Sequence, residues 1–336
     1  MIRLAAILAV LVCLTGPVEA GGPERIWIDS DAACTGAPHK DPDDCLAVWA
    51  LARDGAVDIA GLSSAFGNVG ASEADATLAD LAARIGGLPP VLAGAAGPLR
   101  HRKSAAPTDA ANGMCEALAD GPLTIVALAP LTNVSEAFAT CPERIPNVTR
   151  IVFVGGRRAG HVFHPSEDAM PKARFRHGPI FRDLNVELDP DAARAVLASP
   201  VPITLVPYEL ARQVELTGSD LDLFAAQDAA AARIAASSRP WLAYWHRDIG
   251  RNGFYPFDLV AAAVLLRPET IGCRDLPVAL MRDRKIDLFL GPQSLLLDPP
   301  DRHPARPVTA CLVLRPGGDE AVRGLLAPRA PEAGGA

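Results

Sequence analysis

The sequence is poor in the features that would indicate a nucleic-acid partner, a zinc site or a phosphate loop. Its 32 Lys and Arg residues are outnumbered by 39 Asp and Glu, the formal net charge is −7, and no basic cluster stands out. Binding to a nucleic-acid backbone needs concentrated positive charge, so we expect no nucleic-acid partner. No spacing of cysteine and histidine is typical of zinc ligands. Without His ligands and a Gly-rich phosphate loop, a metal-dependent phosphoester hydrolase is also disfavoured.

Long apolar runs are also scarce, and the one at the N-terminus is shorter than a typical membrane-spanning helix. Residues 1–20 have the three parts of a secretory signal, which are Arg3, an apolar stretch over residues 4–14, and the small-x-small sequence Val18-Glu19-Ala20. We therefore expect cleavage after Ala20 and a secreted or periplasmic mature protein without a stable membrane anchor.

Six of the seven cysteines remain after this cleavage. An even number in an oxidising compartment permits up to three disulfides, for which 15 pairings exist. Small buried thiols are the alternative, and the pairing is left open. A bond between Cys34 and Cys45 would close the loop between two pairs of aspartates. The six are Cys34, Cys45, Cys115, Cys141, Cys273 and Cys311.

Short apolar runs alternate with segments of helical spacing over most of the chain. The expected strands are Ile26–Ile28, Val57–Ser63, Val91–Leu92, Leu123–Leu128, Ile151–Val154 and Ile203–Val206. The expected helices cover residues 43–54, 71–85, 132–139, 190–197 and much of 218–266. This alternation predicts an α/β protein with a mainly parallel, Rossmann-like open sheet flanked by helices. We expect a single large domain over residues 21–315, β-rich from 275 to 313, and a flexible tail over 316–336.

Two pairs of aspartates lie at the start of this pattern. Asp29 and Asp31 end the first apolar run, and Asp43 and Asp44 open the first helical segment. Ligands of parallel α/β sheets bind beyond the carboxyl ends of the strands. Ionised carboxylates that lie close together need protons or a cation to neutralise them, and all-oxygen ligation suits Ca²⁺ or Mg²⁺. The alternative is that Asp43 caps the helix while the others face water.

Polar residues also follow other expected strands. Asn68 follows the second, and Thr132 with Asn133 follows the fourth. As isolated residues, Asn68 would most often be a turn residue, and Thr132 and Asn133 would cap the helix that they open. Asp258 lies in an apolar segment, where a lone carboxylate needs a partner that a metal would provide.

Six motifs occur in order over residues 26–265. They are Asp29-x-Asp31 with Asp43-Asp44, Phe66-Gly67-Asn68-Val69, Ala129-Pro130-Leu131-Thr132-Asn133, Val154-Gly155-Gly156, Asp183-Leu184-Asn185 with Asp189-Pro190-Asp191-Ala192-Ala193, and Phe257-Asp258-Leu259-Val260-Ala261. Each motif is weak alone, but six in sequence are specific. Together they make the chain resemble the inosine–uridine-preferring nucleoside hydrolase family.

The resemblance implies the nucleoside-hydrolase fold and a Ca²⁺-dependent hydrolase that cleaves the N-glycosidic bond of ribonucleosides or a related N-riboside. The implied metal ligands are Asp31, Asp44, Asp258 and the carbonyl of Thr132. Asp31 would also be the general base for the attacking water, and Asp29 would support the loop. The residues implied to bind ribose are Asp43, Asn68, Asp183 and Asn185. A non-catalytic nucleoside- or ribose-binding protein is the alternative, and a homo-oligomer, as a dimer or a tetramer, is left open.

The chain departs from the family pattern at several points. Residues 32–42 replace a compact Pro-Gly-x turn, so Asp31 and Asp44 can share an ion only if this insertion bulges outward. Asp183 stands where the family has Glu. Phe257 replaces a His often assigned as the leaving-group acid, and base specificity is therefore not predicted. Other candidates for the acid lie in a long charged loop and are His161 and His164.

Overall fold

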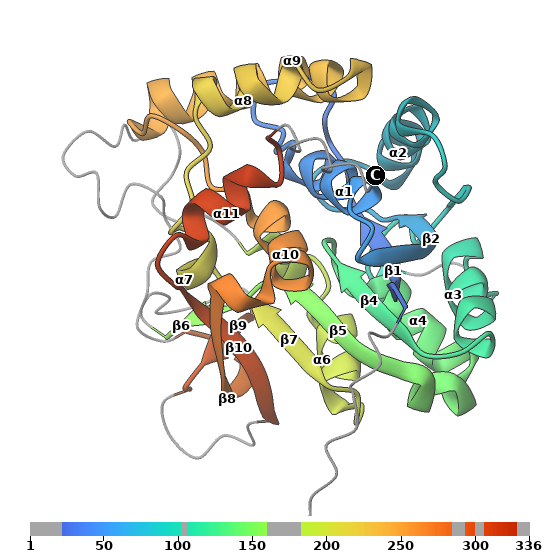
Figure 1. The fold of residues 1–336 in the computed structure, drawn as a ribbon. Coiled ribbons are helices and arrows are strands. Elements are labelled where there is room, and N and C mark those ends of the chain that lie inside the picture. The colour runs from blue at the N-terminus through green and yellow to red at the C-terminus, as the bar shows by residue number, and fades with distance from the viewer. Residues whose placement is uncertain (1–21, 102–105, 160–182, 284–292, 300–305, 328–336) are drawn as a thin grey trace, which may run out of the picture.

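One ten-stranded sheet runs through the computed structural model (Figure 1). The structure describes residues 22–101, 106–159, 183–283, 293–299 and 306–327. The strands are β1 Glu24–Ser30, β2 Val57–Ser64, β3 Val91–Leu92, β4 Leu123–Ala127, β5 Val148–Val154, β6 Arg157–Arg158, β7 Ile203–Val206, β8 Ile271–Met281, β9 Ser294–Leu297 and β10 Arg306–Leu314. Their order in the sheet is β3-β2-β1-β4-β5-β7-β10-β8-β9-β6.

Most of the sheet is parallel. Every neighbouring pair from β3 to β7 runs in the same direction, and β10 is parallel to β7. Only β8 runs against its neighbours, β10 and β9. The prediction of a single α/β domain with a mainly parallel sheet is therefore confirmed. The β-rich region expected after residue 275 continues this same sheet, because β10 pairs with β7 on one side and with β8 on the other.

Helices cover both faces of the sheet (Figure 1). The longer ones are α1 Asp43–Arg53, α2 Ala71–Ile85, α3 Asp109–Ala119, α4 Thr132–Thr140, α6 Pro190–Ala198, α8 Gly218–Ala225, α9 Ala229–Tyr244 and α10 Phe257–Leu266, and the shorter ones are α5 Leu184–Glu187, α7 Tyr208–Ala211 and α11 Gly318–Gly324. Successive residues of a strand point to opposite faces. Ile26 and Ile28 of β1 accordingly pack in one core with α1 and α10, while Trp27 packs in a second core with α3, α4 and α6.

Some helices begin with a capping side chain, but the helices that carry the candidate site residues Asp43, Thr132 and Asp258 do not. Asp189 caps α6 by accepting a 3.1 Å hydrogen bond from the N–H of Ala192, with Pro190 in the first turn. Such a cap satisfies N–H groups that a helix leaves unpaired at its start. By contrast, α1, α4 and α10 have no capping side chain, and Asp43 stands inside α1 after Pro42. The alternative interpretation of Asp43 as an N-cap residue is therefore not what the structure shows.

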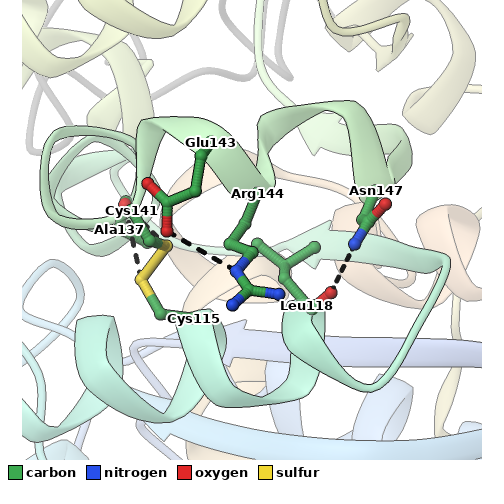
Figure 2. Close-up of polar contacts among 7 residues, drawn as sticks. All are labelled: Cys115, Leu118, Ala137, Cys141, Glu143, Arg144 and Asn147. Atoms are coloured by element: carbon green, nitrogen blue, oxygen red, sulfur yellow. Dashed lines mark hydrogen bonds and ion pairs between the residues drawn. A yellow bond between two sulfur atoms is a disulfide. The ribbon is translucent and has the colours of Figure 1, made fainter.

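Three disulfides pair the six cysteines of the described residues: Cys34–Cys45, Cys115–Cys141 and Cys273–Cys311. Figure 2 shows the second of these, which ties α3 to the residue that follows α4. In the same region, Asn147 donates a 2.7 Å hydrogen bond to the carbonyl of Leu118 in α3. The Cys34–Cys45 bond closes the loop between the two aspartate pairs, as the sequence suggested.

The prediction of a flexible tail from residue 316 is wrong for residues 318–324, which form α11. Val322 of this helix and Leu325 after it are buried in the core that includes α10. This burial stabilises the segment despite the Gly and Pro residues near it. Residues 328–336 of the expected tail and residues 1–20, the expected signal peptide, lie outside the described residues. Among the residues that the structure describes, no helix is both long and apolar enough to cross a membrane.

Candidate active site

Three carboxylates lie close together at the starts of α1 and α10, and one of them accepts two main-chain N–H groups. Asp43 accepts a 3.2 Å hydrogen bond from the N–H of Asp44 and a 3.1 Å bond from the N–H of Asp258. The carboxylates of Asp43, Asp44 and Asp258 each offer an oxygen within 4.8 Å of the others, and all three residues are buried. Two helix N-termini favour negative charge at this point. The set can bind a cation, and it includes Asp43, which the resemblance assigns to ribose.

Asp31 lies beside this set without being part of it. The main-chain N–H of Asn68 donates a 2.8 Å hydrogen bond to Asp31, and the Asn68 amide group lies 3.5 Å from Asp31 and 3.4 Å from Asp44. Gly67 makes this approach possible, because a Cβ at that position would stand 1.6 Å from Oδ2 of Asp31. The structure therefore brings together Asp31, Asp44 and Asn68, and the insertion between the aspartate pairs does not separate them.

Asp29, in β1, supports this arrangement without lining the cavity described below. It is fully buried and accepts hydrogen bonds from the Ser63 hydroxyl and, over 2.8 Å, from the Asn133 side chain. Its other oxygen has no hydrogen-bond partner among the described residues. Burial raises the pKa of Asp29 to about 7. Asn133 also donates to the carbonyl of Ser64, so its role is to tie β1, β2 and α4 together.

Thr132 is the first residue of α4 and is buried, but its side chain does not face the aspartate cluster. Its hydroxyl donates a 2.7 Å hydrogen bond to Asp189, the capping residue of α6. Thr132 is not among the residues that line the cavity described below. The resemblance assigns only its carbonyl to a metal, and that role stays a prediction.

Asp183 and Asn185 reach the site from the far side, next to the ends of β4 and β5. Asp183 accepts a 2.7 Å hydrogen bond from the N–H of Gly156, and burial raises its pKa to about 7. The Asn185 side chain donates to the carbonyls of Leu128, at 2.8 Å, and Val154, at 3.1 Å. Both of these donations use the amide nitrogen, so the amide oxygen of Asn185 remains available as an acceptor.

Many of the acidic and amide side chains of the site line one cavity. It is lined by Asp31, Asp41, Asp43, Asn68, Leu128, Val154, Gly155, Asp183, Leu184, Asn185, Val206, Tyr208, Phe257 and Asp258. The structure thus gathers most of the site residues that the resemblance named. Sequence reasoning missed Asp41 and Tyr208. Asp41 stands two residues before Asp43, which was the available signal, and Tyr208 follows the end of β7.

The cavity is strongly acidic. Burial raises the pKa of Asp31, Asp41 and Asp258 well above the usual range, and the charges of neighbouring aspartates raise it further. The pKa of Asp44 rises to about 6, first through burial and then through the charge of Asp43. Neighbouring carboxylates that are hard to ionise together bind either protons or a cation. Because a cation favours the ionised forms, metal and protons should compete for this cluster.

An aromatic pair forms part of the apolar wall of the cavity. The rings of Tyr208 and Phe257 are stacked, with centroids 6.4 Å apart and planes inclined by 24°. Tyr208 is fully buried, while Phe257 is partly exposed and directly precedes Asp258. This wall suits a flat, apolar group next to the acidic end of the cavity. His161 and His164, the candidates for a leaving-group acid, lie outside the described residues.

Comparisons with known proteins agree with the sequence motifs. The model of the inosine-uridine preferring nucleoside hydrolase family matches residues 26–288. RihA of Shewanella baltica, a pyrimidine-specific ribonucleoside hydrolase, is 27% identical over 172 residues, which are 51% of this chain and 49% of that protein. RihC of Escherichia coli, a non-specific ribonucleoside hydrolase, is 29% identical over 148 residues, which are 44% of this chain and 42% of that protein. The chain thus spans about half the length of the curated relatives that it matches.

Solved structures resemble the chain over a larger part of its length. A plant nucleoside hydrolase has a TM-score of 0.71 at 21% identity, covering 90% of this chain and 98% of the other. The purine-preferring ribonucleoside hydrolase of Gardnerella vaginalis has a TM-score of 0.67 at 19% identity, covering 90% of this chain and 99% of the other. These similarities show a shared fold, and the family model shows descent. The chain belongs to the inosine-uridine preferring nucleoside hydrolase family.

Proposed function

We propose that the protein is a Ca²⁺-dependent hydrolase that cleaves the N-glycosidic bond of ribonucleosides or a related N-riboside. The observation that carries the proposal is the position of Asp31, which lines the cavity, is held by the N–H of Asn68 and lies beside Asp44. A buried carboxylate fixed in this way is suited to accept a proton from a water molecule. Membership of the family supports the same reaction class.

The donor set of the cavity fits a hard divalent cation. Three carboxylates can share one ion, and no Lys, Arg or His is among the described residues that line the cavity. We propose that Asp43 or Asp31 joins Asp44 and Asp258 in holding Ca²⁺, with the carbonyl of Thr132. Several carboxylates in a protein-made cage favour Ca²⁺ over Mg²⁺, which retains more of its water. A bound cation would lower the pKa of a nearby water and orient sugar hydroxyls.

The protein's own residues have distinct parts in the proposed reaction. As the bond from C1′ to the base nitrogen breaks, its electron pair goes to the base, which takes up a proton from solvent. The water oxygen bonds to C1′, and Asp31 accepts a proton of that water. Asp43, Asp183 and the oxygen of Asn185 accept hydrogen bonds from the ribose hydroxyls and hold the ring. Positive charge develops on the ring as the bond breaks, and the surrounding carboxylates stabilise it electrostatically.

A non-catalytic protein that binds nucleosides or ribose is the second candidate function. The observation in its favour is Phe257, an apolar residue that lines the cavity next to Asp258. A ring at this position packs against a base but cannot protonate it as it leaves. The two candidates share the same cavity and differ only in turnover.

We further propose that the mature protein is exported, as its N-terminal sequence predicts. The three disulfides support this proposal, because such bonds form and persist mainly in secreted and periplasmic proteins.

The test is to incubate the protein from residue 21 onward with a panel of purine and pyrimidine nucleosides, with Ca²⁺ or with EGTA, and to assay free ribose. Ca²⁺-dependent ribose release is expected for at least one nucleoside. Binding by calorimetry without ribose release would favour the second candidate. Neither binding nor release across the panel would contradict both.

A further inference from the structure

The segment between the aspartate pairs places a cation next to the wall of the acidic cavity. Lys40 donates a 2.6 Å hydrogen bond from Nζ to the main-chain carbonyl of Asn68. Asn68 lines the cavity, whereas Lys40 is not among the residues that line it. A compact Pro-Gly-x turn, which residues 32–42 replace, has no lysine to make this contact. Lys40 can therefore influence a ligand in the cavity through Asn68 rather than by touching it.

Both main-chain polar groups of Asn68 are hydrogen-bonded to charged side chains. Its N–H donates to Asp31 over 2.8 Å, and its carbonyl accepts from Lys40. Asn68 lies in a turn between β2 and α2, outside any helix or strand. Such a turn has no regular pattern of main-chain hydrogen bonds to fix it, so bonds of this kind set its position. One of the two bonds comes from the insertion.

The position of the Asn68 main chain decides where its side chain lies. The amide nitrogen is 3.5 Å from an oxygen of Asp31 and 3.4 Å from an oxygen of Asp44. Hydrogen bonds of this length are weak, and they do not fix the side chain by themselves. A hydrogen bond from an ammonium group is about twice as strong as one between neutral groups. The contact with Lys40 is therefore suited to hold Asn68 against the two carboxylates.

The main chain that presents Lys40 is itself held in place. His39, directly before it, has a φ of +65°, a conformation that residues other than glycine rarely adopt and keep only where their surroundings fix it. The ring of His39 contacts the ring of Tyr244 in α9 edge to face, with centroids 4.3 Å apart. The Cys34–Cys45 disulfide ties the start of the segment to α1. A donor on a fixed main chain loses less conformational freedom when it binds.

We propose that Lys40 is a positioning residue of the active site, which fixes the main chain of Asn68 and thereby the relative positions of the Asn68 amide group and the Asp31 carboxylate. The inference rests on the proposed function and deepens it, because it assigns part of the geometry of the reaction to the insertion. Without this donor the turn can move away from Asp31. A small displacement of a reacting group lowers the rate strongly.

The test compares Lys40→Met, which removes the donors, with Lys40→Arg, which keeps a charged donor. With saturating Ca²⁺ and a cleaved ribonucleoside, kcat should fall by about tenfold in Lys40→Met and by no more than about threefold in Lys40→Arg. In an Asn68→Ala background, Lys40→Met should lower kcat by no more than about threefold, since the amide group that it positions is absent. Melting temperatures should stay within about 3 °C of wild type.

A second measurement does not depend on turnover. Amide hydrogen exchange in EGTA, followed by mass spectrometry over residues 66–69, should be about fivefold faster in Lys40→Met than in wild type, because the turn opens more often. Arg144→Met is the control in both experiments, since it removes an exposed cation near the second disulfide (Figure 2). It should match wild type in kcat and in exchange.

Wild-type kcat in Lys40→Met would overturn the inference, and so would equal losses in the Met and Arg variants. An undiminished loss in the Asn68→Ala background would show that Lys40 does not act through Asn68. Unchanged exchange in the turn, or unfolding of both Lys40 variants, would also contradict a positioning role. If wild type neither binds nor cleaves nucleosides, the proposed function fails, and the exchange experiment alone decides whether Lys40 holds the turn.

Discussion

Asp43 accepts a hydrogen bond from the main-chain N–H of Asp258 over 3.1 Å, and this bond joins the first turns of two helices that are 215 residues apart in the sequence. The same carboxylate accepts the N–H of Asp44. Two main-chain N–H groups therefore position the Asp43 carboxylate, while the side chains of Ser30 and Asn68 donate to the Asp44 carboxylate. Ligands that the protein itself positions lose less entropy when an ion binds, which favours a defined site over a diffuse acidic surface.

We expect Asp258→Asn to weaken Ca²⁺ binding by more than about tenfold, since it removes one charged ligand and keeps the shape of the side chain. The main-chain N–H that pairs with Asp43 remains, so the fold should persist. Calorimetric Ca²⁺ titration and elemental analysis after desalting measure the loss. Asp191→Asn, which changes an exposed carboxylate of α6, is the control. Equal Ca²⁺ affinity in both variants would contradict the proposed metal site.

Asp31→Asn should lower kcat by about 10²- to 10⁴-fold, the usual contribution of a general base. The amide can still lie beside Asn68, so KM and the melting temperature should change little. Steady-state assays of ribose release with saturating Ca²⁺ provide the measurement. Activity close to wild type would remove Asp31 from the proposed mechanism.

The sequence predicts the local features of this fold better than its long-range contacts. The run Ile26–Ile28 identifies β1, and the helical spacing after Asp43 identifies α1, because each pattern lies within a few residues. The position of Asp41 in the cavity wall depends on the fold of its segment, which a disulfide and the contact between Lys40 and Asn68 hold in place and which no local pattern reveals. Likewise, α11 is stabilised by packing in the core that includes α10, which composition alone does not reveal.

The candidate site, too, can be predicted from the sequence only in part. The motifs place Asp31, Asp44 and Asp258 near one another, and the structure does so too. Side-chain directions bring oxygens of Asp43, Asp44 and Asp258 within 4.8 Å of one another, with Asp31 beside them. Spacing in the sequence cannot resolve such directions, because they depend on how α10 packs against α1.

Gly67→Ala should reduce activity by about 100-fold while leaving the fold in place. A Cβ at this position would stand 1.6 Å from Oδ2 of Asp31, so the carboxylate must move, and small displacements of a reacting group carry losses of this order. Gly70→Ala is the control, because no atom lies within 4 Å of a Cβ there and its φ of −68° suits alanine. Similar kcat values in the two variants would show that the position of Asp31 does not limit the reaction.

The stability of the Ca²⁺-free protein should decrease as the pH rises toward neutrality. Burial raises the pKa of Asp183 to about 7 in the folded protein, against 3.8 for an aspartate exposed to water, so the folded state binds a proton that the unfolded chain has lost. The resulting stabilisation is complete below the lower pKa and is lost as the pH rises through the higher one. In EGTA, the free energy of unfolding should fall between about pH 5 and pH 7.5, by roughly 2–3 kcal/mol from this group alone.

Urea unfolding of wild type and Asp183→Asn at both pH values measures this dependence. The variant lacks the titrating group and should show a smaller decrease, while Asp29, whose pKa is also about 7, still contributes. Added Ca²⁺ should stabilise the wild type more at the higher pH, where fewer protons compete for the cluster. A stability that rises with pH in EGTA would contradict the raised pKa values.

The Cys34–Cys45 and Cys115–Cys141 disulfides offer a matched pair of tests. Replacing either pair of cysteines by alanine should lower the free energy of unfolding by about 2–4 kcal/mol. Only the loss of Cys34–Cys45 should also lower kcat/KM, by about tenfold or more, because this bond holds the segment that carries Asp41 and leads into Asp43. The second disulfide joins α3 to the residue that follows α4 (Figure 2), and neither of its cysteines is among the residues that line the cavity. Equal activity losses in the two double variants would mean that the insertion affects the site only through overall stability.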